Sequence, residues 1–210
     1  MELVVDEVAV AGARSPLVQP TSFVAPPARV TPVAGDPGYG QVALALALAG
    51  RMPLAGGRVL LGGSGDPEVL RRHVAVVDVP GVSAPEDGLA VHHVLAEELA
   101  FAGRPSGRRA VAAFLTAHGV AATADAPFET LAPEDRVRVL AHAAAERTAS
   151  RVLVITNPDR RGGDARTWWP VLEDLAADGI TVVVQLTHAT MRQLDLPVRA
   201  ELGCAQEVVA

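Results

Sequence analysis

Residues 35–42 of this chain read Gly35-Asp36-Pro37-Gly38-Tyr39-Gly40-Gln41-Val42. The stretch has the glycine spacing of a P-loop, in which backbone between a strand and a helix cradles a phosphate. A nucleotide-binding P-loop continues with Lys, which reaches the β- and γ-phosphates, and then with Ser or Thr, which binds Mg²⁺. Gln41 and Val42 stand at those positions, and all 18 basic residues of the chain are arginines. The stretch therefore predicts the backbone of a phosphate-binding loop without its cation and without its metal ligand.

Length, charge and cysteine content narrow the class of protein. The chain has 210 residues, a net charge of −6 and a single cysteine, Cys204. A negative net charge disfavours a nucleic-acid partner, and one cysteine excludes an intramolecular disulfide and a cysteine metal cluster. The longest apolar run, Val42 to Gly50, is far shorter than the roughly 20 residues of a membrane-spanning helix. The N-terminus is acidic, unlike a signal peptide, and the histidines have no metal-ligand spacing, so we expect a cytoplasmic chain without a metal site.

Hydrophobic patterning predicts strands that alternate with helices, which is typical of an α/β fold with a parallel sheet. The N-terminal region, broken by prolines, reads as an antiparallel edge, and Pro32 counts against the strand that contains it. Strong helix formers favour a helix between the glycine loop and Gly50. We expect strands at Leu3–Val5, Val8–Val10, Arg29–Ala34, Arg58–Leu61, Val74–Val77, Arg151–Thr156 and Thr181–Leu186, and further helices at Leu89–Ala102, Arg108–Ala117, Pro133–Thr148 and Trp168–Asp178.

The order of these pieces resembles the nucleotide-binding subunit of ATP-binding cassette (ABC) transporters over roughly residues 1–190. The resemblance rests on spaced segments, most of which depart from the family's residues. These are the P-loop 35–42, Asp78 in place of the Q-loop Gln, Leu131-Ala132-Pro133-Glu134-Asp135 in place of the signature Leu-Ser-Gly-Gly-Gln, Thr156-Asn157-Pro158 in place of Asp-Glu-Pro after the Walker B strand, a D-loop near Gly162-Gly163-Asp164, and His188, which matches the switch histidine.

The resemblance implies one P-loop-type cassette domain over residues 1–210. Residues 1–83 and 131–210 would form the α/β core with a β edge, and residues 84–130 a helical subdomain. The implied cofactor-binding positions are Gly35, Asp36, Gly38, Gly40, Gln41, Val42 and Asp78, the signature-like positions are Leu131, Ala132, Pro133, Glu134 and Asp135, and the degenerate catalytic positions are Thr156, Asn157 and His188.

The substitutions remove the chemistry that phosphoryl transfer needs. Thr156 replaces an Mg²⁺ carboxylate, and Asn157 replaces the general base, a role that an amide cannot fill because it takes no proton. Asp78 would bring negative charge close to a γ-phosphate, and Glu134 and Asp135 would oppose a nucleotide at the signature helix. Because losing one catalytic donor costs about 10²–10³ in rate, we expect no ATPase activity from the chain alone and, at most, weak ATP binding.

Three functions remain open from the sequence. The first is a non-hydrolysing interaction subunit whose partner is a membrane permease or a competent ABC ATPase subunit at the inner face of the membrane. The second is an ATPase in which arginines such as Arg51, Arg71 or Arg72 supply the positive charge. The third is a nucleotide sensor that binds without hydrolysis. For the first, the expected docking surface lies in region 84–130, and any homo-oligomer would form without nucleotide.

Overall fold

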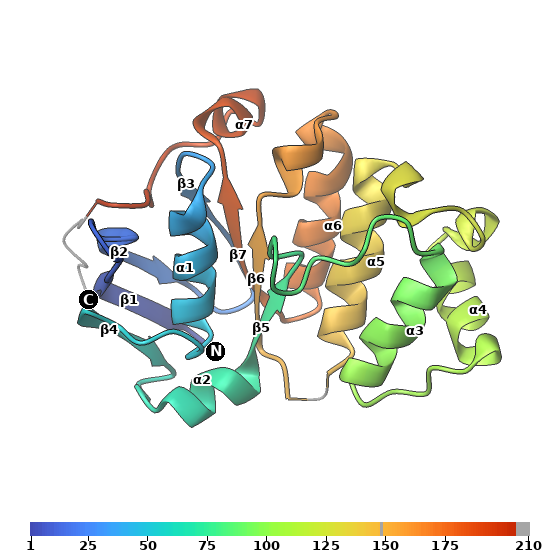
Figure 1. Ribbon diagram of the computed structural model, residues 1–210, viewed down its shortest axis with the longest axis horizontal. Coiled ribbons are helices and arrows are strands. Elements are labelled where there is room, and N and C mark those ends of the chain that lie inside the picture. The colour runs from blue at the N-terminus through green and yellow to red at the C-terminus, as the bar shows by residue number, and fades with distance from the viewer. Residues whose placement is uncertain (148, 205–210) are drawn as a thin grey trace.

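Two β-sheets enclose a central helix, and further helices cover the far side of the second sheet (Figure 1). The computed structural model of the chain describes residues 1–147 and 149–204. The strands are β1 (Leu3–Val10), β2 (Val18–Ala25), β3 (Val30–Ala34), β4 (Gly56–Leu61), β5 (Val74–Val77), β6 (Val152–Thr156) and β7 (Thr181–Leu186). The α-helices are α1 (Tyr39–Leu48), α2 (Pro67–His73), α3 (Val91–Phe101), α4 (Arg108–Ala117), α5 (Pro133–Ala145), α6 (Ala165–Ala177) and α7 (His188–Gln193).

The sheets differ in direction, as expected for a core with an antiparallel edge. An antiparallel sheet has the order β2-β1-β4, and a parallel sheet has the order β3-β7-β6-β5. Helix α1 packs between them, whereas α5 and α6 cover the other face of the parallel sheet and α3 and α4 lie beyond α5 (Figure 1). The mixed α/β fold class with a mainly parallel core sheet and an antiparallel edge is confirmed.

Side-chain alternation along the parallel strands builds a core on each face of the sheet. In β6, Val152 and Val154 belong to the cluster around α1, and Leu153 and Ile155 belong to the cluster around α5 and α6. Both faces are buried, which explains why these strands are continuous apolar runs rather than alternating ones. The carboxyl ends of β3, β6 and β7 meet at one edge, and this edge carries the loop 35–38 that enters α1.

Several predicted elements need correction at the N-terminal edge. The two short strands predicted at Leu3–Val5 and Val8–Val10 are one strand, β1, which is irregular around Glu7, where φ is 48°. Strand β2 was not predicted because prolines interrupt this region; it contains Pro20, yet it pairs with β1 at the edge of its sheet. Pro32 is tolerated for the same reason, since β3 lies at the edge of its sheet, where a missing N–H costs little.

The observed helices also differ from the predicted ones. Helix α2 was missed, although Asp66 caps it by accepting a hydrogen bond from the Glu68 N–H and Pro67 occupies its first turn. Helix α6 begins at Ala165 rather than Trp168, because Asp164 caps it. Helix α3 is shorter than predicted at both ends, and α5 ends at Ala145; Thr148, the predicted end of α5, lies outside the described residues. Among the described residues, no helix has the length and apolar character that a membrane crossing requires.

Candidate functional site at the loop before helix α1

The side chain at the P-loop lysine position is turned onto the loop itself. Gln41 lies in the first turn of α1 and is only 2% exposed. Its Nε2 donates a hydrogen bond of 2.9 Å to the carbonyl oxygen of Gly35, at the start of the loop. The amide therefore ties the two ends of the loop together and brings no charge, whereas a lysine ammonium at this position would offer charge to a phosphate.

A chain of neutral hydrogen bonds continues from Gln41 to the position of the Walker B carboxylate. Thr156, at the end of β6, donates through Oγ1 to Oε1 of Gln185 on β7, at 2.8 Å. Gln185 in turn donates through Nε2 to the main-chain carbonyl of Gln41, at 2.9 Å. All three residues are buried. The side chains of Thr156 and Gln185 pair with each other here, and Oε1 of Gln41 has no donor among the described residues, whereas a hydrolysing site would place a cation, a metal and a carboxylate.

Asn157 follows Thr156 in a left-handed conformation, with φ 47° and ψ 59°. It is 6% exposed, and its Oδ1 has no hydrogen-bond donor within the described part of the chain. Its carbonyl oxygen accepts a hydrogen bond from Arg160. Asn157 thus stands at the predicted general-base position with an amide that cannot accept a proton at neutral pH.

Packing leaves little room for a side chain at two of the loop glycines. A Cβ atom on Gly40 would lie 2.8 Å from the carbonyl oxygen of Leu17, and one on Gly35 would lie 3.0 Å from the Leu202 Cβ. Gly38, in contrast, has extended backbone, and a Cβ atom on it would meet nothing within 4 Å. The glycine spacing that resembles a P-loop is therefore explained in part by the close approach of other segments.

This contrast predicts opposite outcomes for two alanine substitutions. Gly40→Ala should destabilise the fold by about 1–3 kcal/mol, because backbone must move to admit the methyl group, even though alanine favours a helix. Gly38→Ala should change the free energy of unfolding by less than about 0.5 kcal/mol, as for an open surface site. Urea denaturation of both variants measures the difference, and equal effects would show that the close contacts of Gly40 do not constrain it.

The negative charge of Asp78 is balanced by arginines in the structure. Asp78 follows β5 and is 7% exposed. Arg136 of α5 donates to both of its oxygens, at 3.0 and 2.8 Å, and an Arg160 nitrogen lies 2.6 Å from Oδ1. These arginines use the hydrogen-bonding capacity of the Asp78 carboxylate. The role of Asp78 as a nucleotide contact stays a prediction.

The same ion network extends to Asp87. Arg136 places Nη1 3.3 Å from Asp87 Oδ1, and Arg161 donates to both oxygens of Asp87 at 2.6 and 2.7 Å. The hydrogen bond from Arg161 is the first cause of a lowered pKa at Asp87. We name Asp78, Asp87, Arg136, Arg160 and Arg161 the arginine–aspartate network; it joins the segments after β5 and β6 to helix α5.

The signature-like residues lie at the start of α5 and are engaged within the chain. Leu131 is buried in the core, and Ala132 precedes Pro133, the first residue of the helix. The Glu134 carboxylate accepts a hydrogen bond from Thr167 of α6 at 3.2 Å, and Asp135 pairs with Arg138 at 2.6 Å. Both carboxylates thus have local partners at the end of the helix where negative charge is favoured.

His188 opens α7 and lies beside the loop. Its Nε2 is 3.0 Å from Glu201 Oε1, and its Nδ1 is 3.9 Å from Asp36 Oδ1. Thr187 caps the helix, and Asp159 holds the cap by accepting hydrogen bonds from the Thr187 N–H and hydroxyl. The structure therefore brings His188 close to Asp36 of the loop and to Glu201, and the role of His188 as a switch histidine stays a prediction.

Sequence reasoning missed Arg136, Arg160, Gln185, Asp159 and Glu201. Only Gln185 carried a signal, because it is a polar residue inside the apolar run of β7. The partners of the others are distant in sequence: Arg136 and Asp78 are separated by 58 positions. Val42, the predicted metal-ligand position, is partly buried and has no oxygen in its side chain.

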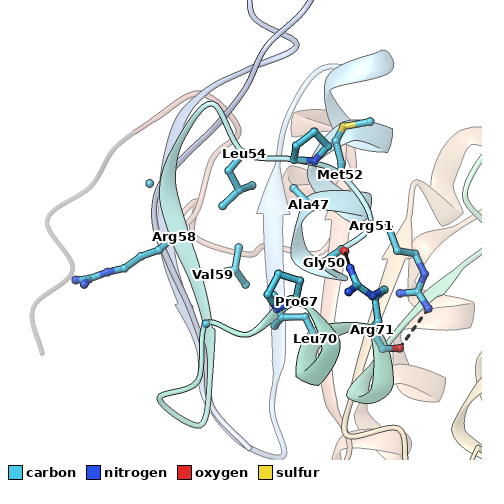
Figure 2. A pocket seen from close by; sticks show the side chains of 13 residues that line it. Ala47, Gly50, Arg51, Met52, Leu54, Arg58, Val59, Pro67, Leu70 and Arg71 are labelled. Atoms are coloured by element: carbon cyan, nitrogen blue, oxygen red, sulfur yellow. Dashed lines mark hydrogen bonds between the residues drawn. The ribbon is translucent and has the colours of Figure 1, made fainter.

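A hollow of about 740 Å³ lies at the opposite end of α1 from the loop (Figure 2). Arg51 and Arg71 line it, but Arg51 donates to the carbonyl oxygens of Ala49 and Arg71, and Arg71 donates to that of Gly50. Arg58 points away from the hollow in Figure 2 and pairs with Asp6. A helix of ten residues spans about 15 Å, so these arginines are far from the loop.

No protein-family model and no curated protein matches the sequence. Solved structures do: a nucleotide-free ATP-binding cassette from an ABC transporter has a TM-score of 0.70 at 15% identity, covering 97% of this chain and 90% of that one. A putative ABC transporter ATP-binding protein from Pyrococcus furiosus has a TM-score of 0.65 at 13% identity, covering 88% and 90%. Another ATP-binding cassette of an ABC transporter has a TM-score of 0.69 at 16% identity, covering 89% and 82%.

The chain therefore has the ATP-binding cassette fold. At these identities the likeness establishes the fold alone. The chemistry of the site rests on its own residues, which are neutral amides at the lysine and base positions and Val42 and Thr156 at the metal-ligand positions.

Proposed function

We propose that this chain is a cassette-fold interaction subunit that does not hydrolyse ATP and that assembles with a membrane permease, or with a competent cassette subunit, at the cytoplasmic face of a membrane. The observation that carries the proposal is the hydrogen bond from the buried Gln41 amide to Gly35. It occupies the lysine position with a neutral group whose Nε2 donates to the loop itself, while its Oε1 has no hydrogen-bond donor within the described residues.

The physical argument concerns charge. Phosphoryl transfer depends on neutralising a highly charged nucleotide with a lysine, a metal ion and positioned donors. Thr156 and Gln185 satisfy each other, and Asn157 offers an amide in place of a carboxylate. A helix N-terminus contributes only about 0.3–1 kcal/mol toward an anion, which does not compensate for those losses.

An ATPase driven by other arginines receives no support from their positions. Arg51 and Arg71 lie at the C-terminal end of α1 and donate to backbone carbonyl oxygens. Arg160, which is closer to the site, is paired with Asp78. A sensor that binds nucleotide without hydrolysis is the second candidate, favoured by one observation: no side chain of the described residues caps α1, so its first-turn N–H groups are not used by a cap.

Activity and assembly measurements on the full chain test the proposal. We expect no phosphate release above a no-protein control, and the same oligomeric state by light scattering with and without Mg·ATP. Bringing Glu134 and Asp135 of one copy against the phosphates held by another would set like charges together in a desolvated site, which is costly.

Two outcomes would contradict the proposal. One is turnover on the order of 1 s⁻¹, typical of an enzyme, that disappears in a His188→Ala variant and so belongs to this chain. The other is a monomer that dimerises only when nucleotide is added. Micromolar, Mg²⁺-dependent binding without turnover would instead favour the sensor.

A further inference from the structure

A groove of about 720 Å³ opens between the segment 82–89, helix α3 and the C-terminal end of α5. Ala75 and Val76 of β5 contribute to its wall. None of the implied cofactor-binding or signature-like positions lines it, although Arg51 does. The groove is therefore separate from the loop before α1 and needs its own explanation.

The rim of this groove exposes large apolar side chains. Phe101, the last residue of α3, is 78% exposed, and Val82 is 51% exposed. Most exposed apolar residues occur singly and need no explanation, whereas aromatic and aliphatic side chains gathered at a concave site mark surfaces that a partner covers. The pair at this rim therefore indicates a contact surface.

Carboxylates line the same groove and are not paired with its arginines. Glu86, Glu97 and Glu98 form no ion pair within residues 1–147 and 149–204. Burial raises the pKa of Glu98 to about 7, and the charges of Glu97 and Asp78 add to the shift. A desolvated carboxylate of this kind is stabilised in its charged form when a cation comes next to it.

In the described part of the chain, the arginines that line the groove do not pair with these glutamates. Arg51 donates to the carbonyl oxygens of Ala49 and Val74, which uses its guanidinium for the backbone. Arg147 follows the C-terminal end of α5 and forms no ion pair with the three glutamates, all of which are described residues. The side of the groove formed by α3 and residue 86 is thus left acidic.

We propose that this groove binds a segment of a protein partner that has an apolar face and a basic side chain, with the apolar face covering Val82 and Phe101 and the basic group pairing with Glu97 and Glu98. This inference rests on the proposed function, an interaction subunit, and adds to it the chemistry of the partner segment that binds at the expected docking region. An acidic segment, a nucleic acid or an anionic lipid surface would bring like charge against these carboxylates, which is costly.

The probe for this proposal is a fluorescently labelled amphipathic peptide of about 14 residues, roughly four helical turns, with leucines on one face and arginines at one end. Binding to the full chain is measured by fluorescence anisotropy. We expect the double variant Glu97→Gln with Glu98→Gln to weaken peptide binding by about tenfold, because a charge pair is lost. We expect Val82→Ala to weaken it at least threefold, on the order of what lost apolar contact area costs.

Matched controls lie on other surfaces of the chain. Glu129→Gln removes an exposed carboxylate outside the groove, and Val198→Ala truncates a valine of similar exposure. Both should bind the peptide within about twofold of the unaltered chain, as expected for sites outside the contact. Thermal denaturation confirms that every variant is folded before binding is compared.

Exchanging the charges of the peptide and of Glu97 tests whether these two groups pair directly. Replacing the arginines of the peptide with aspartates should weaken its binding to the unaltered chain, and Glu97→Arg should restore binding of this acidic peptide. The proposal is wrong if the unaltered chain binds neither peptide, if the charge changes have no effect, or if the control variants weaken binding as much as those in the groove.

The result separates this inference from the proposed function. Absent ATPase activity together with charge-independent peptide binding would reject the basic partner and leave the interaction subunit in place. Nucleotide turnover together with charge-dependent binding would reject the non-hydrolysing subunit and leave the groove as a docking site.

Discussion

Replacing Arg136 with alanine is expected to lower the free energy of unfolding by about 3–5 kcal/mol, the cost of leaving buried charges without their partner. Arg136 is 4% exposed, donates two hydrogen bonds to Asp78 and one to Asp87, and places its guanidinium 4.6 Å from the centre of the Phe128 ring. Removing it leaves Asp78 buried beside Arg160 alone and opens a cavity against Phe128.

Urea denaturation measures this loss, and Arg138→Ala is the matched control on the same helix. Arg138 pairs with Asp135 in a partly exposed i,i+3 contact, and such pairs contribute at most about 1 kcal/mol. If the two substitutions cost the same, the arginine–aspartate network does not stabilise the fold. A double-mutant cycle with Asp78→Ala would then measure the coupling between Arg136 and Asp78 directly.

The second large effect concerns nucleotide affinity. Gln41→Lys with Val42→Thr should tighten Mg·ATP binding by about 10- to 150-fold, because a hydrogen bond to a charged group contributes about 1.5–3 kcal/mol. The substitution also removes the hydrogen bond from the Gln41 amide to Gly35, which frees the loop. Hydrolysis should stay absent until Thr156→Asp and Asn157→Glu restore the metal ligand and the base.

Calorimetric titration with Mg·ATP measures the affinity, and Gln41→Met with Val42→Thr provides a control of similar length without the charge. A folded lysine variant that gains no affinity would mean that the loop backbone has lost the P-loop conformation. Because a lysine at a buried position is destabilising when unpaired, the thermal stability of each variant must accompany the binding data.

Much of the fold was predictable because its elements are specified by neighbouring residues. The apolar β-branched run 181–186 and the strong helix formers of α1 appear in the structure as strand and helix. Local rules misled at β2, which was not predicted because prolines interrupt that region. Pro20 is tolerated there because β2 is an edge strand, as Pro32 is tolerated in the predicted strand β3. Helix α2 was missed although its Asp66-Pro67 start is a recognisable cap.

For the candidate site, the sequence predicted which chemical groups are missing, but not the contacts that the residues make. The resemblance in order and spacing assigned Gly35, Gln41, Thr156, Asn157 and His188 to segments of a cassette, and their residue types predicted that the lysine, metal ligand and base are missing. These assignments stay predictions. The division of the chain at residues 84–130 into a separate helical subdomain stays a prediction.

Tertiary structure decided what those residues do instead. The bond from Gln185 to Gln41 joins positions 144 apart, and the pairing of Arg136 with Asp78 joins positions 58 apart. Such contacts depend on which strands lie side by side and on how α5 packs against the sheet, so no periodicity or motif near either residue encodes them. The sequence by itself predicted that the charged groups of an ATPase are missing. Only the packed fold determined that the Gln41 amide bonds to the loop, that buried arginines neutralise Asp78, and that glutamates line the α3 side of a groove.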